Sequence, residues 1–195
     1  MKKLPTYKLV ISEEENDERE VDFIALVDEP AIQRNWLAFN EDKQRFQADK
    51  DRRIISGAAM VPGMKIFRYN EKLGEHYVVF DKNTVETICQ KFFKKGYTSN
   101  FNLMHSAEHK TDGVYLFESF IIDKERGIAA PKGFGALTEG TWFISCKVDN
   151  DMIWDHFVKT GIFKGFSVEG VFAYGSEENF SDQSVMGQIL QIIES

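Results

Sequence analysis

Short apolar runs of strand length, separated by turn residues, follow one another along most of this chain. Such runs, rich in the β-branched and aromatic side chains typical of strands, cover residues 7–12, 21–30, 76–80, 114–122, 141–148 and 164–174. Residues 54–70 read as two further strands joined by a Val-Pro-Gly turn. Because most of these runs succeed one another without an intervening helix, we expect a mainly antiparallel sheet.

Two internal segments show helical periodicity instead. Residues 84–96 place Val85, Ile88, Cys89, Phe92 and Phe93 on one apolar face. We expect the second helix, residues 149–161, to begin at a cap on Asp149 and to end at Gly161. Strand runs and helices together predict an α+β fold, with a mainly antiparallel sheet or barrel and two flanking helices.

Composition excludes several classes of protein. The 195 residues include 24 Lys and Arg against 31 Asp and Glu, a net charge of −7, which argues against a nucleic-acid binder. No apolar window is long enough to span a membrane, and the N-terminus does not read as a secretory signal, so a cytoplasmic location is expected. Cys89 and Cys146 sit in apolar surroundings without a Cys-x-x-Cys motif, as expected of small buried side chains.

The chain length suggests one domain followed by a tail. We expect a domain over residues 1–175, and over residues 176–195 a polar linker that leads into a short amphipathic segment. Docking of this tail on a partner, on a second copy or on its own domain would each bury the apolar face.

Several motifs of enzymes are missing or incomplete. The sequence contains no glycine-rich nucleotide motif and no Gly-x-Ser-x-Gly, so nucleotide binding and α/β-hydrolase chemistry lack support. His105, Glu108 and His109 match the His-x-x-Glu-His spacing of inverted zinc peptidases, which needs a helix. Because Thr-Asp-Gly follows His109 within four residues and would cut such a helix short, we expect no metal and no cofactor, and a zinc peptidase is the weaker alternative.

A serine and a histidine are better placed for chemistry. His105 ends the strand-like run 101–105, and Ser167 lies in a strand-like run flanked by glycines. Alternation along that strand puts Ser167 and Glu169 on one face. A nucleophilic serine needs a base within reach and a third group that orients the base. Glu118, flanked by apolar residues, is one such carboxylate, although an edge-strand position would explain it equally well.

Several stretches together resemble one family. These are ALVDEPAI (25–32), RRIISGAAMVPGMKIFR (52–68), NLMH with ES (102–119), GTWFISCKVDND (140–151) and VKTGIFKGFSVEG (158–170). In this order they resemble the XkdF-type serine proteases of tailed phages, which belong with the prohead, or capsid maturation, proteases. The resemblance implies a barrel of mainly antiparallel strands with flanking helices, similar to the herpesvirus assemblin.

The family resemblance also implies roles for single residues. His105 would be the general base and Ser167 the nucleophile, and we expect them on adjacent strands with their side chains in one groove. No histidine follows His156, so the third member would be a carboxylate, with Glu118 and Glu169 as candidates and Asp112 as a weaker one.

Oxyanion stabilisation is the part of the family pattern from which this chain departs. No arginine follows Arg126, whereas assemblin places arginines near its oxyanion site after the serine. The oxyanion would therefore be stabilised by backbone N–H groups, by Lys164 or by Lys147.

The function implied is that of a serine endopeptidase inside the phage procapsid, in the host cytoplasm. It would cleave the scaffold and major capsid proteins, and itself, during maturation. Dimerisation is implied by analogy with assemblin, and neither nucleic acid nor membrane is an expected partner. The main alternative is a procapsid structural or scaffold-associated protein that keeps the same fold without catalysis.

Overall fold

The structure, a computed structural model, describes residues 4–11, 21–27, 47–106, 110–135 and 137–177. Its strands are β1 (Thr6–Val10), β2 (Val21–Val27), β3 (Gln47–Asp49), β4 (Ile54–Met60), β5 (Ile66–Asn70), β6 (Gly74–Val79), β7 (Phe101–Leu103), β8 (Val114–Ile121), β9 (Trp142–Val148), β10 (Gly165–Gly170) and β11 (Ala173–Glu177). Its helices are α1 (Lys82–Lys94), the 3-10 turn Tyr97–Ser99, α2 (Asp151–Ile153) and the π-helix Trp154–Val158. The predicted α+β class is confirmed.

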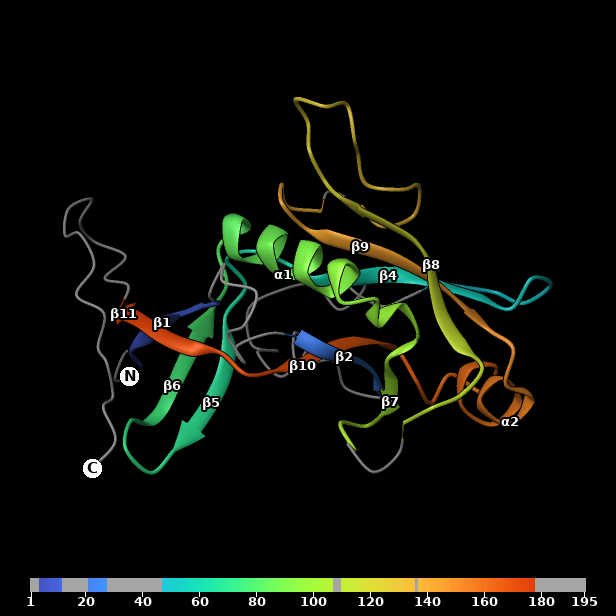
Figure 1. Ribbon diagram of the computed structural model, residues 1–195, viewed down its shortest axis with the longest axis horizontal. Helices are drawn as coiled ribbons and strands as arrows, with labels where there is room; N and C mark the ends of the chain where they lie inside the picture. Colours follow the sequence, from blue (N-terminus) through green and yellow to red (C-terminus); the bar gives the residue numbers. More distant parts are fainter. Residues whose placement is uncertain (1–3, 12–20, 28–46, 107–109, 136, 178–195) are drawn as a thin grey trace.

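The strands form three sheets, ordered β11-β1-β6-β5, β10-β2-β7 and β3-β4-β9-β8. In Figure 1 the first sheet and the third lie at opposite ends of the molecule, with β2 and β10 between them. Most pairs are antiparallel, and among the described strands only β1–β6 and β2–β7 run parallel. Within the described ranges these sheets do not close into one barrel, so the barrel expectation lacks support.

The core connects α1 with the sheets. The predicted apolar face of α1 is confirmed at Val85, Ile88 and Phe92, which are fully buried where the helix packs against β2 and β9. Cys89 is only half-buried, and Phe93, expected on the same face, is 39% exposed. The Phe92 ring meets Trp142 of β9 edge-on, with 5.5 Å between ring centroids. Aromatic pairs in this geometry contribute beyond the area that they bury.

The start of α1 depends on Asp81, whose side chain accepts a hydrogen bond from the Thr84 backbone N–H. Partial burial raises the pKa of Asp81, but the hydrogen bonds from Lys8 and Thr84 outweigh this effect, so the pKa lies below its ordinary value of 3.8. A carboxyl group whose pKa is lower in the folded than in the unfolded state stabilises the fold at pH values above its unfolded-state pKa. This contribution is lost as the pH falls through the folded-state pKa.

We therefore expect Asp81→Ala to lower the free energy of unfolding at pH 7 by about 1 kcal/mol, because a helix N-cap is lost. Urea denaturation at pH 7 and pH 3 would measure this effect, and the cost should shrink at the lower pH. Asp81→Asn keeps the capping oxygen and should cost less at pH 7. Equal stability of Asp81→Ala and wild type at pH 7 would contradict the prediction.

The second predicted helix differs from expectation in its cap and its hydrogen bonding. Asn150, not Asp149, is the cap, because its side chain accepts from the Ile153 N–H. After one α-turn the segment becomes a π-helix, in which the Lys159 N–H donates to the Trp154 carbonyl. Gly161 ends it with a φ of 74°, as expected.

The last predicted strand, residues 164–174, is in fact two strands in different sheets. β10 pairs with β2, whereas β11 pairs with β1. The register of β10 shifts between Glu169 and Gly170, and the chain then crosses to the neighbouring sheet. Phe172 lies in this crossing and packs its ring on Phe80 at 4.9 Å between centroids.

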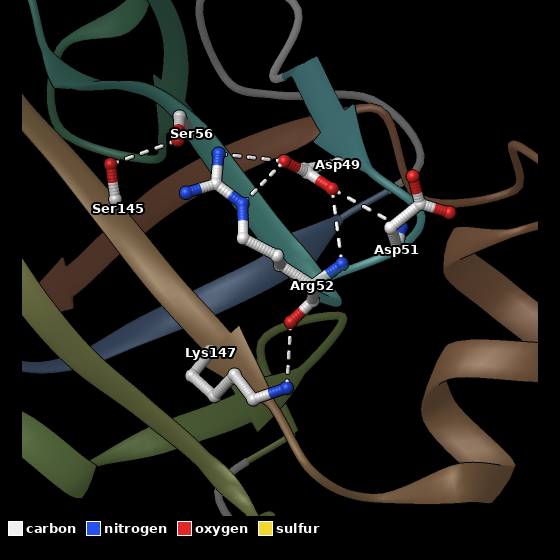
Figure 2. A network of polar contacts seen from close by, with 6 residues as sticks. All are labelled: Asp49, Asp51, Arg52, Ser56, Ser145 and Lys147. Atoms are coloured by element: carbon white, nitrogen blue, oxygen red, sulfur yellow. Dashed lines mark hydrogen bonds and ion pairs between the residues drawn. The ribbon is translucent and has the colours of Figure 1, made fainter.

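The third sheet begins at the short edge strand β3. Figure 2 shows the turn that follows it, where Asp49 accepts hydrogen bonds from the Asp51 N–H and from both the backbone and the side chain of Arg52. These Arg52 hydrogen bonds lower the pKa of Asp49. The Lys147 ammonium of β9 donates to the Arg52 carbonyl at 2.7 Å.

Both cysteines are free thiols. Cys146 is fully buried, and burial raises its pKa well above the ordinary value. Burial also raises the pKa of Cys89 to about 11. Thiols that remain protonated are weak nucleophiles, so the interpretation as small buried side chains holds for Cys146 and largely for Cys89.

Some predictions fall on residues that the structure does not describe. They are Glu108 and His109 of the zinc-peptidase motif, and the tail from residue 178 onward. In the part of the chain that is described, no helix has both the length and the apolar character needed to cross a membrane.

Candidate active site

Ser167 lies in the middle of β10, and its side chain is 4% exposed. It is directly opposite Ala25 of β2, which in turn is opposite Asn102 of β7. Residues opposite one another in a sheet share a face, so these three side chains point to the same side. Because Ala25 contributes only a methyl group, longer side chains from β10 and β7 can meet above it.

His105 follows β7 but does not lie on it. The strand ends at Leu103, and Met104 and His105 then adopt left-handed conformations, with φ values of 55° and 58°. Bulky residues rarely adopt this conformation, and such backbone outliers concentrate at functional sites. The expectation of adjacent strands is therefore wrong, because β2 separates β7 from β10.

Glu169 is the carboxylate that meets this histidine. Its Oε2 lies 3.6 Å from His105 Nδ1, and the same oxygen accepts a hydrogen bond of 2.6 Å from Asn102 Nδ2. Asn102 is fully buried, so its amide holds the carboxylate from the interior of the sheet. With Nδ1 turned toward Glu169, the opposite nitrogen of the His105 ring is left for proton transfer.

Asn102 has one further unusual feature. Its Oδ1 is the only buried side-chain N or O atom of the described residues without a hydrogen-bond partner. An unpartnered buried acceptor typically costs about 1–3 kcal/mol. The amide cannot simply turn over, because Oδ1 would then face the Glu169 carboxylate. This unfavourable buried acceptor therefore belongs to Asn102, the residue that holds the candidate catalytic carboxylate of Glu169.

Ser167, His105 and Glu169 border one pocket of about 560 Å³. Its volume is in the range of about 300–1,000 Å³ found for small-ligand sites. No hydrogen bond joins Ser167 to His105 among the contacts that the structure describes. Catalytic hydrogen bonds are often long before substrate binds, so the shared pocket is compatible with proton transfer between them. The predicted common groove is present.

The other carboxylate candidates lie elsewhere. Glu118 is exposed on β8, the edge strand of a different sheet, opposite Ser145 of β9. Asp112 is exposed, and its carbonyl accepts from the Asn150 amide. Neither is among the described residues that line the pocket, whereas Glu169 is. The structure thus brings Glu169, and not Glu118 or Asp112, to His105.

The two lysines considered for the oxyanion also lie away from the pocket. Lys147 is on β9, where it contacts the Arg52 carbonyl (Figure 2). It also contacts the Asp149 carboxylate. Lys164 precedes β10 and is exposed. Among the described lining residues, Arg68 of β5 is the one lysine or arginine. Arg68 was not predicted from the sequence, because the family pattern places arginines only after the serine.

Sequence reasoning also missed Asn102. The run 101–105 reads as an apolar strand, and Asn102 is a polar residue within it. A polar residue in such a run indicates that its side chain needs a hydrogen-bond partner. A buried amide must find a partner, and a partner in a sheet comes from a neighbouring strand. The partner, Glu169, is 67 positions away and cannot be identified by spacing.

No group of three or more residues in the described ranges could hold a metal ion, and the zinc-peptidase motif is described only at His105. Comparisons of the chain with family models, with curated proteins and with solved structures find no match. The site must therefore be interpreted from its own geometry.

Proposed function

We propose that this protein is a serine endopeptidase that matures phage proheads by cleaving scaffold and major capsid proteins, and also itself. The observation that carries the proposal is the pocket shared by Ser167, His105 and Glu169, with Glu169 facing His105 Nδ1 at 3.6 Å. A buried serine, a histidine and a carboxylate that faces the histidine are the three groups that acyl transfer requires.

The proposed reaction is acyl transfer through Ser167. Its Oγ attacks the scissile carbonyl carbon while the His105 nitrogen remote from Glu169 takes the hydroxyl proton. Glu169 stabilises the resulting imidazolium, and Asn102 keeps Glu169 in place. His105 then protonates the departing amine, the C–N bond breaks, and water hydrolyses the acyl-enzyme with His105 again acting as the base.

The prohead role is supported by the sequence resemblance to XkdF-type phage proteases. The fold is compatible with it, because β4 lies beside β10 and so brings the second and third sheets together. We propose that these two sheets correspond to parts of an assemblin-like barrel. In this proposal the enzyme acts within the procapsid in the host cytoplasm, and dimerisation follows the assemblin analogy.

A catalytically inactive procapsid protein is the second candidate. Two observations favour it: no hydrogen bond between Ser167 and His105 is found in the described part, and neither Lys147 nor Lys164 borders the pocket. Cleavage separates the two proposals. Purified protein would be incubated with the scaffold and capsid proteins encoded beside it, and fragments would be identified by mass spectrometry. Fragments support the endopeptidase, and intact substrates support the structural role.

The two glutamates provide a matched test of the third residue. We expect Glu169→Gln to lower kcat/KM by about 100-fold or more, because the orienting carboxylate is lost. Glu118→Gln should change kcat/KM less than about 3-fold, since an exposed side chain outside the pocket is altered. Cleavage rates of one fluorogenic peptide would compare them. A larger loss of kcat/KM for Glu118→Gln than for Glu169→Gln would assign the orienting role to Glu118.

A further inference from the structure

Part of the pocket lining is formed by apolar side chains, which we call the apolar wall. Met64, Ile66, Phe172 and Tyr174 line it and are all only half-buried, and Met60 and Phe80 line it from the core. These side chains come from β4, from the β4–β5 connection, from β5, from the residue after β6, from the β10–β11 crossing and from β11. Separate parts of the chain thus bring their apolar side chains to the pocket that contains Ser167.

Tyr174 shows how this wall is kept apolar. The Nδ1–H of His76, which is fully buried, donates to the Gly74 carbonyl at 2.8 Å. Its Nε2 forms a hydrogen bond of 3.2 Å with the Tyr174 hydroxyl. The hydroxyl is therefore satisfied inside the protein, which leaves the ring as the surface offered to the pocket. His76 thus has a structural role behind the wall.

We propose that this wall is the specificity subsite of the enzyme and takes one large apolar side chain, such as Leu, Met or Phe, of an extended peptide substrate. The inference rests on the proposed function, because Ser167, His105 and Glu169 identify a peptide as the molecule that enters the pocket. Groups suited to acyl transfer require a peptide carbonyl beside Ser167, and the same pocket continues into the apolar wall. One peptide that enters the pocket therefore presents both its scissile carbonyl and a nearby side chain.

The chemistry of the wall favours a flexible aliphatic or aromatic occupant over a charged one. Two methionines can adjust to different shapes, and the paired rings of Phe80 and Phe172 also line the pocket. A charged side chain would lose its hydration against these apolar residues without gaining a partner from them, and Arg68 of β5, which also lines the pocket, could pair only with a negatively charged one. We expect discrimination between a large apolar residue and alanine of about 10- to 100-fold in kcat/KM.

Ile66 allows a sharp test, because it is half-buried and lies on a rigid strand. On β5, Ile66 is opposite the buried Val78, whereas Tyr69 lies on the other face and is 68% exposed. Ile66→Lys places an ammonium in the subsite, and Tyr69→Lys adds the same charge to the same strand outside it. Ile66→Ala, which enlarges the subsite without adding charge, serves as a second variant that should fold readily.

The probe is a pool of tryptic peptides from an unrelated proteome, with cleavage sites determined by mass spectrometry. Wild type and Tyr69→Lys should enrich Leu, Met and Phe at one position relative to the scissile bond. Ile66→Lys should lose this preference at least 10-fold and favour Asp and Glu at the same position, and Ile66→Ala should shift it toward larger aromatic residues. Ser167-dependent cleavage without any apolar preference, or a preference unchanged in both Ile66 variants, would overturn the subsite.

A binding measurement separates failure of the subsite from failure of the protease. Immobilised Ser167→Ala protein is equilibrated with the same peptide pool, and the retained peptides are identified. Retention of apolar peptides that Ile66→Lys abolishes, without any cleavage by wild type, supports the subsite and overturns the protease. Absence of both retention and cleavage overturns both proposals.

Discussion

Replacing Ser167 with alanine should abolish cleavage of scaffold and capsid proteins, with a loss in kcat on the order of 10³-fold or more. The change removes one oxygen from a side chain that is 4% exposed in a regular strand, so the strand and its pairing with β2 should persist. His105→Ala should cause a similar loss. The double variant should lose little more, because a nucleophile and its base act as a unit.

The measurement is single-turnover cleavage of the co-expressed capsid and scaffold proteins, with folding checked by circular dichroism. Asn102→Asp is an informative companion, because it places a second carboxylate beside Glu169 and should disturb the orientation of His105 without touching the serine. If a well-folded Ser167→Ala protein cleaves as fast as wild type, this serine is not the nucleophile.

Replacing Phe92 with alanine should have the largest effect on stability. Phe92 is fully buried in α1, and its ring meets those of Tyr97 and Trp142 at 5.9 and 5.5 Å between centroids. Phe-to-Ala changes in a core usually cost about 3–5 kcal/mol, because a cavity is left as well as lost burial. For a domain of this size we expect the melting temperature to fall by roughly 10 °C.

Phe93 provides the control for this change. It is the next residue of the same helix, and its side chain is 39% exposed. Phe93→Ala should therefore lower the free energy of unfolding by about 1 kcal/mol, as a change at a partly exposed site does. Urea denaturation of both variants gives the comparison. Equal losses in the free energy of unfolding for Phe92→Ala and Phe93→Ala would mean that α1 does not pack on β9 through Phe92.

The helices and most strands could be predicted because local patterns encode them. The apolar face of α1 follows from the spacing of Val85, Ile88 and Phe92, and burial of that face is the consequence of packing it on a sheet. Apolar periodicity could not predict that the second helix changes from α to π hydrogen bonding. An α-turn and a π-turn differ by one residue in hydrogen-bond partner, which leaves almost no trace in the apolar pattern.

The crossing from β10 to β11 shows a second limit. Residues 164–174 read as one strand because every local preference along them is that of a strand. Pairing with β2 on one side of the crossing and with β1 on the other decides where the strand breaks. Such pairing is a property of distant segments, and no local preference reports it.

The sequence by itself determined the α+β class, the two helical segments and a short set of side chains able to act as nucleophile, base and carboxylate. It could not choose between Glu118 and Glu169, because both are carboxylates in strand-like runs. The tertiary structure decided this choice. Parallel pairing of β2 with β7 and antiparallel pairing with β10 set Asn102, Ala25 and Ser167 in one row. The left-handed turn after β7 then brings His105 to Glu169. These contacts join residues more than 60 positions apart, and their positions are set by strand register, which depends on the packing of the whole sheet and not on local sequence.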